Sequence, residues 1–423
     1  MNNLLSKISI VLLMSQLCMT MAIGQKFNVE EAKKIAVFGH VLYIVNPNCG
    51  VICYDIKDIQ NIQLIGTFRV SGVTDIAVEN NLLYVNYLGG VCTIYTDEMR
   101  GGEPLKENRL KANCVDGIVK NVRDGDIFPI KFFPKEDMPC KDETLSFGAF
   151  SQAGSLSAFA SLEDVVYIGS INGLYTIKAD VDGIIDLEDY EKIPMQTDSI
   201  ETLFVGQNQE YLYLGGQNGT YIYSIKGQYR YAPEFVKEIP HQIGCDPIYV
   251  KNGIAFITVR KGADCIQNNW NWKVMESRLI ILDLSWPSQP EALYNSGEFV
   301  SAPRGLSGTD KNILWVCEDG TRSGIIVNLI DVSSKRTPKR HGRILAHQDY
   351  EMKIAYDVIL REDKDLAMVR FDNGIGVYQG INKTSPSLIN FIPLPDNYSP
   401  EPPITELSPA LKEKSNQKVS GRK

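Results

Sequence analysis

Five charged residues stand near the beginnings of short apolar segments that are spread along the chain: Asp75, Glu201, Asp246, Arg304 and Asp357. Carboxylates gathered around a narrow opening would suit Ca²⁺ or another hard cation, and a mixed set of charges would suit a polar ligand. No spacing of the EF-hand type supports calcium directly, so we expect no resident cofactor. The structural alternative, which we favour for these five residues, is that a charged side chain recurs because it caps the start of a strand in each unit.

Two tryptophans offer a second kind of site. Trp270 and Trp272 lie in the polar segment Gly262–Ser277, which reads GADCIQNNWNWKVMES. An exposed tryptophan in such a segment can stack on a sugar ring or on a protein partner. An equally good alternative is that both side chains fold back onto the protein as a local plug.

Signatures of catalysis are weak in this sequence. The nucleophile elbow, the zinc-protease helix, the P-loop and the dinucleotide fingerprint are all missing from it. His241 and His347 each precede an apolar segment, and a histidine beside Asp, Glu or Tyr could do acid–base work on a polysaccharide. The sequence therefore favours a non-catalytic module that binds a glycan or an extracellular protein. A polysaccharide hydrolase or lyase is the alternative, and a scaffold in a surface assembly is the third possibility.

The cysteines are consistent with an oxidising compartment. Nine are present, and setting Cys18 aside leaves an even number that allows disulfides. A zinc site is not expected, because no CxxC pair occurs. Some thiols would instead be buried and free, above all Cys53 and Cys92 within apolar segments. The disulfide candidates are Cys114 with Cys140, and Cys245 with Cys265.

The segments around these residues form a repeat with a period of roughly 40 to 50 residues. Its most regular part is a short strand that usually opens with a glycine. Before nearly every copy lies another short strand with an aromatic residue near its end. The period, with four short strands per unit, is typical of a β-propeller. The copies of the regular strand are Gly50–Asp55, Gly90–Tyr95, Gly173–Lys178, Gly219–Ser224, Arg278–Asp283, Gly324–Leu329 and Gly374–Gln379.

A propeller explains how such units bury their apolar residues. One small twisted sheet cannot cover both of its apolar faces, but sheets packed around an axis cover one another. We therefore predict an all-β propeller of seven blades, each with four antiparallel strands; the weaker third and fourth copies leave six or eight blades open. The ring would close either by pairing Phe27–Val29 with the last sheet or through a last unit that is complete by itself. The five charged residues, the tryptophan segment and an insertion at 97–154 would share one end of the ring.

The turns after the regular strand resemble those of the LVIVD-type propeller proteins. Asp283–Pro290 and Asp331–Pro338 follow the family's D-V-S-x-P-x-x-P pattern best, Tyr54–Asn61 is a weaker copy, and Ile381–Pro386 keeps only the final proline. The resemblance implies a bacterial extracytoplasmic β-propeller with no catalytic motif to carry over. Locally, we expect the aspartate to accept backbone donors within the turn and the proline to end strand pairing.

The N-terminal segment indicates export, and the C-terminal segment has the composition of a tail. Lys7 followed by the apolar stretch Ile8–Leu17 and cleavage near Gly24 predict a signal peptide over residues 1–24. Lipidation of Cys18 is not favoured, since Leu17 precedes it. The propeller would span 25–395, with the insertion as an ordered flap, and 396–423 would be a disordered tail. We expect a secreted, cell-surface or periplasmic protein.

Charge and length limit the partners. The chain has 423 residues and a net charge of −8, which argues against nucleic acid, whose phosphates need a basic surface. No stretch reaches the ~20 apolar residues that span a bilayer. We expect a monomer.

Overall fold

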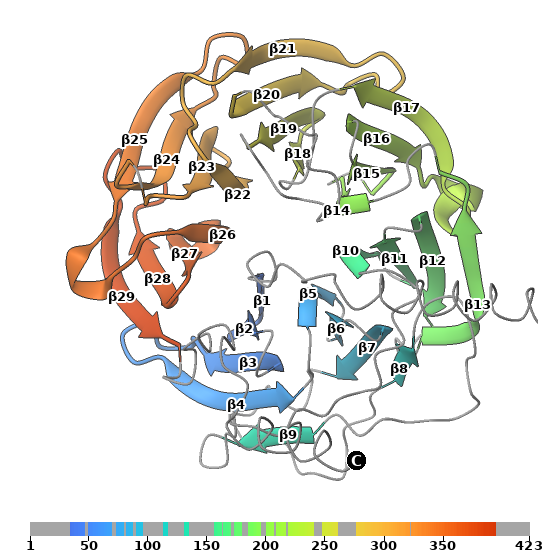
Figure 1. Cartoon of the computed structure of the whole chain (residues 1–423), viewed down its shortest axis with the longest axis horizontal. Coiled ribbons are helices and arrows are strands. Elements are labelled where there is room, and N and C mark those ends of the chain that lie inside the picture. The colour runs from blue at the N-terminus through green and yellow to red at the C-terminus, as the bar shows by residue number, and fades with distance from the viewer. Residues whose placement is uncertain are drawn as a thin grey trace, which may run out of the picture.

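A computed structural model of the chain shows a ring of antiparallel sheets around a central axis (Figure 1). The structure describes residues 34–46, 50–69, 73–79, 82–87, 90–95, 113–116, 131–134, 156–162, 164–170, 173–179, 185–195, 200–206, 209–216, 219–240, 248–260, 276–321 and 323–394, and within several of these strands only the backbone. Statements below concern these residues.

In each sheet four strands follow one another in the chain, beginning at the axis and moving outward, and the first sheet adds β9 at its outer edge. The first four sheets are β1–β4 with β9, β5–β8, β10–β13 and β14–β17. Their bounds are β1 Ile35–Phe38, β2 Val41–Asn46, β3 Gly50–Asp55, β4 Gln63–Arg69, β9 Lys131–Pro134, β5 Val73–Glu79, β6 Leu82–Tyr87, β7 Gly90–Tyr95, β8 Asn113–Asp116, β10 Leu156–Leu162, β11 Val165–Ser170, β12 Gly173–Ala179, β13 Ile185–Ile193, β14 Ile200–Val205, β15 Tyr211–Gly216, β16 Gly219–Ser224 and β17 Glu234–Pro240.

The remaining sheets are the fifth, β18–β21, the sixth, β22–β25, and the last, β26–β29. Their bounds are β18 Ile248–Lys251, β19 Ile254–Val259, β20 Arg278–Asp283, β21 Glu291–Ser296, β22 Pro303–Gly308, β23 Ile313–Glu318, β24 Ile325–Asp331, β25 Lys339–Leu345, β26 Ala355–Arg361, β27 Leu366–Phe371, β28 Gly374–Gln379 and β29 Ser387–Pro393. Short 3₁₀ turns lie at Gly227–Arg230, Gln348–Tyr350 and Glu362–Lys364.

The expected four-stranded antiparallel unit occurs in six sheets, not in seven. The first sheet has a fifth strand, because β9 pairs antiparallel with β4 and covers its outer edge. The neighbouring β8 supplies the fourth strand of the second sheet. Both strands come from the segment 97–154, which the sequence presents as an insertion. The repeat pattern in the sequence does not reveal these two strands, because each is only four residues long and lacks an opening glycine.

The regular strands of the repeat are the third strands of the sheets. β3, β7, β16, β20 and β28 have the bounds that the sequence predicts, β12 extends by one residue, and β24 begins at Ile325. Glycine opens such a strand for a steric reason that is clearest at Gly219, where φ is +156°. A Cβ there would collide with the carbonyl oxygen of Ile239 on the neighbouring β17.

The aspartate at the end of the third strand organises the following turn, as predicted. In three sheets its Oδ1 accepts the backbone N–H two residues later, at 2.8 Å in each case. The pairs are Asp55 with Lys57, Asp283 with Ser285, and Asp331 with Ser333. Hydrogen bonds from these serines hold the pKa of Asp283 and Asp331 below the ordinary value.

Among the described strands none is shared between the two ends of the ring, and the last sheet consists of four consecutive strands. Phe27–Val29, the other candidate for closure, lies outside the described residues. Side chains bridge the junction instead. The Tyr54 hydroxyl donates to the Pro393 carbonyl at 3.3 Å, and the Asn390 amide donates to the Ile59 carbonyl at 2.8 Å. An apolar cluster with members from both sheets, among them Leu42 and Val377, fills the space between them.

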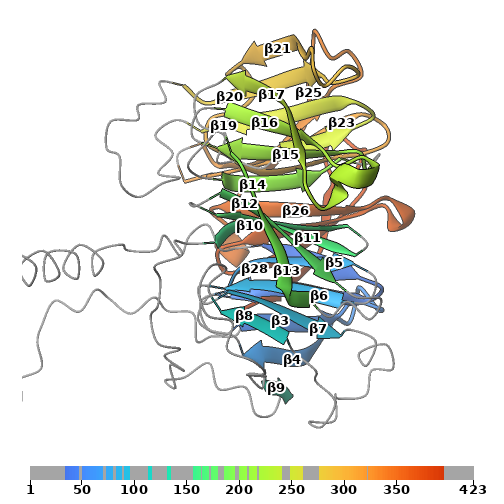
Figure 2. The ribbon, with the colours of Figure 1, turned by 90° about the vertical axis from the view of Figure 1, so that its right-hand side faces the viewer.

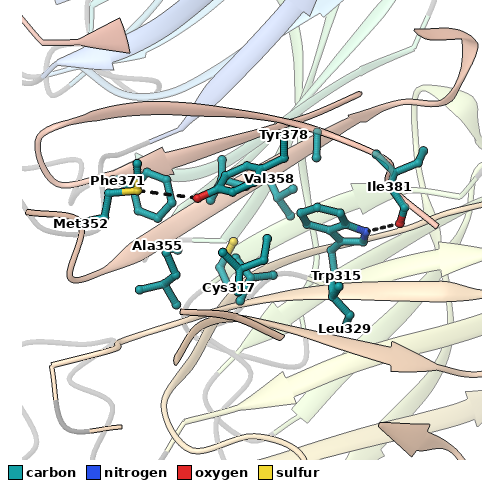
Figure 3. Close-up of a cluster of buried hydrophobic side chains, with 14 of the residues drawn as sticks. Trp315, Cys317, Leu329, Met352, Ala355, Val358, Phe371, Tyr378 and Ile381 are labelled. Carbon is teal, nitrogen blue, oxygen red and sulfur yellow. Dashed lines mark hydrogen bonds between the residues drawn. The ribbon is translucent and has the colours of Figure 1, made fainter. Parts of the chain in front are cut away.

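Packing between neighbouring sheets is best seen between the sixth and last sheets (Figure 3). Trp315 of β23 is completely buried there, and its indole Nε1 donates to the Ile381 carbonyl at 3.0 Å. Met352 points into the same cluster, where its sulfur accepts a hydrogen bond from the Tyr378 hydroxyl at 3.6 Å. The core of the protein is therefore a series of such layers between the sheets.

The strands run between two faces of the ring (Figure 2). We call the face at which the innermost strands begin the mouth face and the opposite one the far face. Because strands alternate in direction, the connections between sheets and those from second to third strand lie at the mouth face, and the third-to-fourth turns lie at the far face. Among the described residues there is no helix of the length and hydropathy needed to cross a membrane.

Candidate binding site on the mouth face

Two of the seven candidate ligand-binding residues, Arg304 and Asp357, have described side chains. Asp75 and Glu201 lie on the innermost strands β5 and β14, where only the backbone at these positions is described. The other three, Asp246, Trp270 and Trp272, lie outside the described residues.

The innermost strands share a local irregularity near their beginnings. The pairing register of β5, β10, β14, β22 and β26 shifts there, as in a β-bulge. Asp75 and Asp357 both directly follow the shift, whereas Glu201 is the residue that it skips. Bulges redirect side chains and are common at functional sites. Four of the five charged residues, Asp75, Glu201, Arg304 and Asp357, therefore lie at or beside this irregularity, although not at one equivalent position.

Asp357 links the last sheet to the first. Its Oδ1 accepts the Val358 N–H at 3.0 Å, and its Oδ2 accepts the Ile35 N–H at 3.5 Å. Burial raises the pKa of this carboxyl, while the Lys34 ammonium and the two N–H donors act in the opposite direction. A carboxylate with these partners helps to close the ring.

Arg304 similarly links the sixth sheet to the last. Its guanidinium lies 4.7 Å from the centre of the Tyr356 ring, and its NH2 group is 3.8 Å from Oδ2 of Asp319. The adjoining Gly305 allows the strands to approach, since a Cβ there would lie 2.8 Å from Asp357 Oδ1. The contacts of Arg304 and Asp357 therefore agree with the structural alternative, in which charged residues secure the strand starts.

We predict that Asp357→Asn flattens the dependence of stability on pH. A carboxyl whose native pKa is raised stabilises the fold most below its unfolded value of about 3.8, and that contribution disappears as the pH rises through the native pKa. Asparagine has no such titration. Urea unfolding at several pH values from 3.5 to 7 measures the effect. Asp283→Asn is the control of opposite sign, because the lowered pKa of Asp283 stabilises the fold above its unfolded value. Superimposable curves for Asp357→Asn and wild type would contradict the prediction.

A more exposed group of side chains lies on the connection 346–354, which joins β25 to β26 at the mouth face. The Tyr350 side chain is 40% exposed. Its ring centre lies 4.9 Å from that of Phe391 on β29 and 5.0 Å from that of His347. We call His347, Tyr350 and Phe391 the aromatic platform. Gly374 makes room for it, since a Cβ there would collide with the Phe391 ring.

The connection that carries the platform is held at several points. The Asn373 amide donates to the Tyr350 carbonyl at 2.5 Å, and the Gly320 N–H donates to the Lys353 carbonyl at 2.8 Å. Met352, two residues beyond Tyr350, is buried between the sixth and last sheets (Figure 3). The exposed ring is therefore ordered before any ligand arrives, which lowers the entropic cost of binding.

The polar groups around the platform do not form a catalytic pair. Nδ1 of His347 lies 3.8 Å from Oδ2 of Asp349, beyond hydrogen-bond distance, and both side chains are exposed. His241, the other histidine of interest, lies outside the described residues. No group of three or more metal-binding side chains occurs within the described part of the chain.

Two cysteines have described side chains, Cys53 and Cys317, and both are buried free thiols whose pKa is raised by burial. For Cys53 this confirms the expectation of an apolar packing role. The candidate disulfide residues Cys114, Cys140, Cys245 and Cys265 lie where no side chain is described, and the described residues contain no disulfide.

Sequence reasoning singled out His347 but missed Tyr350 and Phe391, the other two members of the aromatic platform. Its local signal is the segment His347–Glu351, which is rich in aromatic and acidic residues and falls between two strands. Phe391 comes from another strand some forty residues later, so only the fold brings the rings together.

Of the comparisons with known proteins, only the search of solved structures found matches, and these bear on the fold alone. No family model and no curated protein matches the chain. Among solved structures, the computationally designed Ika8 protein is 12% identical, with a TM-score of 0.50 over 85% of this chain and 87% of its own. A functionally unknown protein from Desulfotomaculum acetoxidans DSM 771 is 11% identical, with a TM-score of 0.47 over 76% of this chain and 80% of its own. The chain is an all-β propeller, and similarity this distant carries no function with it.

Proposed function

We propose that this protein is a non-catalytic binding module that recognises a glycan on the mouth face of the propeller. The observation that carries the proposal is the exposed Tyr350 ring, whose centre lies 4.9 Å from that of Phe391 and 5.0 Å from that of His347, with both ring pairs tilted. The apolar face of a sugar ring can stack on such an aromatic surface while its hydroxyls remain hydrated or bond to polar neighbours. The exposed Asp349 carboxylate and His347 imidazole are polar groups on the same connection.

The tryptophan segment belongs to the same proposal. It lies between Val259 of β19 and Arg278 of β20, and both of these ends are at the mouth face. Trp270 and Trp272 would add stacking surface for a longer glycan or for a protein ligand. In this proposal the protein acts outside the cytoplasm, as the predicted signal peptide over residues 1–24 and the LVIVD-like turns favour. The five-stranded first sheet then counts as one of seven blades.

A glycan and extracellular-protein array tests the proposal with the purified protein and three variants. Tyr350→Ala should weaken glycan binding about tenfold, which corresponds to ~1.4 kcal/mol. Tyr350→Phe should bind like wild type, since the ring is kept. The matched control is Trp286→Ala, which removes an aromatic side chain that is 76% exposed in the β20–β21 turn of the far face. A Trp270→Ala/Trp272→Ala double variant measures the share of the tryptophan segment.

Either of two results would overturn the proposal. If Tyr350→Ala and Trp286→Ala both bind a glycan as wild type does, the aromatic platform is not the site. If wild type binds nothing on the array, the protein is not a glycan or protein receptor, and assays of polysaccharide cleavage become the next step.

A further inference from the structure

We infer that the glycan bound at the aromatic platform is neutral, and that the Asp372 carboxylate accepts hydrogen bonds from its hydroxyl groups. This inference rests on the proposed function and adds the chemical class of the ligand. Asp372 and Asn373 form the turn between β27 and β28, at the mouth face. Aromatic rings supply a stacking surface for a sugar, and a few well-placed polar groups beside them fix its orientation.

The turn between β27 and β28 borders the aromatic platform at two points. The Asn373 amide donates to the Tyr350 carbonyl at 2.5 Å. The next residue, Gly374, lies against the Phe391 ring, with which a Cβ at this position would collide. Asp372 directly precedes Asn373, and the two Cα atoms are about 3.8 Å apart. A glycan chain stacked on Tyr350 can therefore present its hydroxyls to Asp372.

The same turn is held from the inside of the sheet. The Arg370 side chain is completely buried, and its guanidinium donates to the carbonyls of Phe371 and Gly374, one on each side of the turn. The bond to Gly374 is 3.3 Å long. The backbone at Asp372 is thus fixed before a ligand arrives, as is that of Tyr350, and this lowers the entropic cost of binding.

The Asp372 side chain has no protein partner within the described part of the chain. It takes part in no hydrogen bond or ion pair there, and its Oδ1 atom is buried whereas its Oδ2 atom is not. The residue as a whole is half-buried, so the carboxylate is partly shielded from water without receiving a donor in exchange. Such a group costs free energy, and hydroxyl donors from a ligand would offset that cost through charge-assisted hydrogen bonds.

The simpler reason for an aspartate in a turn is that its side chain bonds to the backbone nearby. The sixth sheet shows that arrangement at the equivalent place, where Asp319 is the first residue after β23 as Asp372 is after β27. Oδ1 of Asp319 accepts the Thr321 N–H at 3.0 Å and the Thr321 hydroxyl at 2.6 Å. Asp372 makes no such bond, so the geometry of its turn does not account for it.

The charges near the platform disfavour an acidic glycan. The connection 346–354 contributes Asp349 and Glu351, both exposed, and the turn adds Asp372. Lys353 is the one lysine or arginine in the residues 346–354 and 371–374. A carboxylate or sulfate on the glycan would meet like charges here, which weakens binding. The hydroxyls of a neutral sugar instead meet groups that accept hydrogen bonds.

The test uses calorimetry with two pairs of β-1,4-linked hexasaccharides that differ only at C6, glucose with glucuronate and mannose with mannuronate. In at least one pair, wild type should bind the neutral member about fivefold or more tightly than its uronate at low salt, and this preference should shrink as the salt concentration rises. Asp372→Asn keeps the size of the side chain. It should bind the neutral member about tenfold more weakly and lose the preference. The matched control is Glu298→Gln, which removes an exposed carboxylate from another connection of the mouth face and should bind like wild type.

The outcomes separate this inference from the proposed function. Uronates that bind as tightly as their neutral partners, in a manner that still depends on Tyr350, would overturn the neutral class and leave the glycan site in place. Wild-type affinity of Asp372→Asn for the neutral member would overturn the role of Asp372. Failure to bind all four hexasaccharides would overturn the inference, while the array with Tyr350→Ala would still decide the proposed function. Circular dichroism of each variant establishes that it is folded.

Discussion

Trp315→Ala is expected to lower the free energy of unfolding by about 3–5 kcal/mol, the usual cost of truncating a buried tryptophan. Trp315 is completely buried between the sixth and last sheets, and its ring meets that of Tyr378 edge-on at 6.4 Å. The truncation leaves a cavity in this layer and deprives the Ile381 carbonyl of its indole donor. Urea unfolding followed by circular dichroism measures the change.

Two further variants define the origin of that loss. Trp315→Phe keeps most of the apolar contact but not the N–H donor, so we expect a smaller loss of about 1–2 kcal/mol. Trp286→Ala removes the same side chain from an exposed turn and should change stability by less than about 0.5 kcal/mol. If Trp315→Ala were as stable as Trp286→Ala, the layer between these sheets would not hold the ring together.

Glu318→Ala is the second large effect that we expect, a loss of about 3 kcal/mol. This carboxylate at the end of β23 is buried, and burial raises its pKa. It accepts the Ala302 N–H at 2.7 Å, the Ser301 hydroxyl at 3.0 Å and the Asn328 amide at 3.0 Å. Removing it leaves these donors without an acceptor in a place that water does not reach, and that is the costly part of the change.

The position of Glu318 gives this prediction a structural readout. Ser301 and Ala302 belong to the connection between the fifth and sixth sheets, so Glu318→Ala should also speed hydrogen exchange of their amides. Glu298→Ala, in the same connection but exposed, is the control and should leave both stability and exchange unchanged. A Glu318→Ala protein with wild-type exchange at Ala302 would show that other contacts hold the connection.

Local sequence was a reliable guide wherever the structure is decided by neighbours in the chain. The third strand Gly219–Ser224 combines an opening glycine with Thr, Ile and Tyr, and the strand ends that these residues predict agree with the structure. The turns that begin at Asp283 and Asp331 were equally predictable, because an aspartate bonds to a backbone N–H only two residues away.

The roles of the charged residues could not be assigned in the same way. Arg304 and Asp357 look alike in sequence, as charged residues at strand starts, and a ligand site was a reasonable hypothesis for both. Their partners, Tyr356 for Arg304 and Ile35 for Asp357, belong to neighbouring sheets, and Ile35 is 322 residues away from Asp357. These partners depend on how neighbouring sheets pack in the ring, and a local sequence pattern does not predict that packing.

The sequence by itself determined the propeller fold, because the period of the apolar strands and the glycine and aspartate turns depend on short-range sterics and hydrogen bonds. Only the tertiary structure decided that β9 widens the first sheet and that Phe391 and His347 lie beside Tyr350. Each of these results depends on pairing or packing between strands, where the gain in buried area and hydrogen bonds comes from residues far apart in the chain.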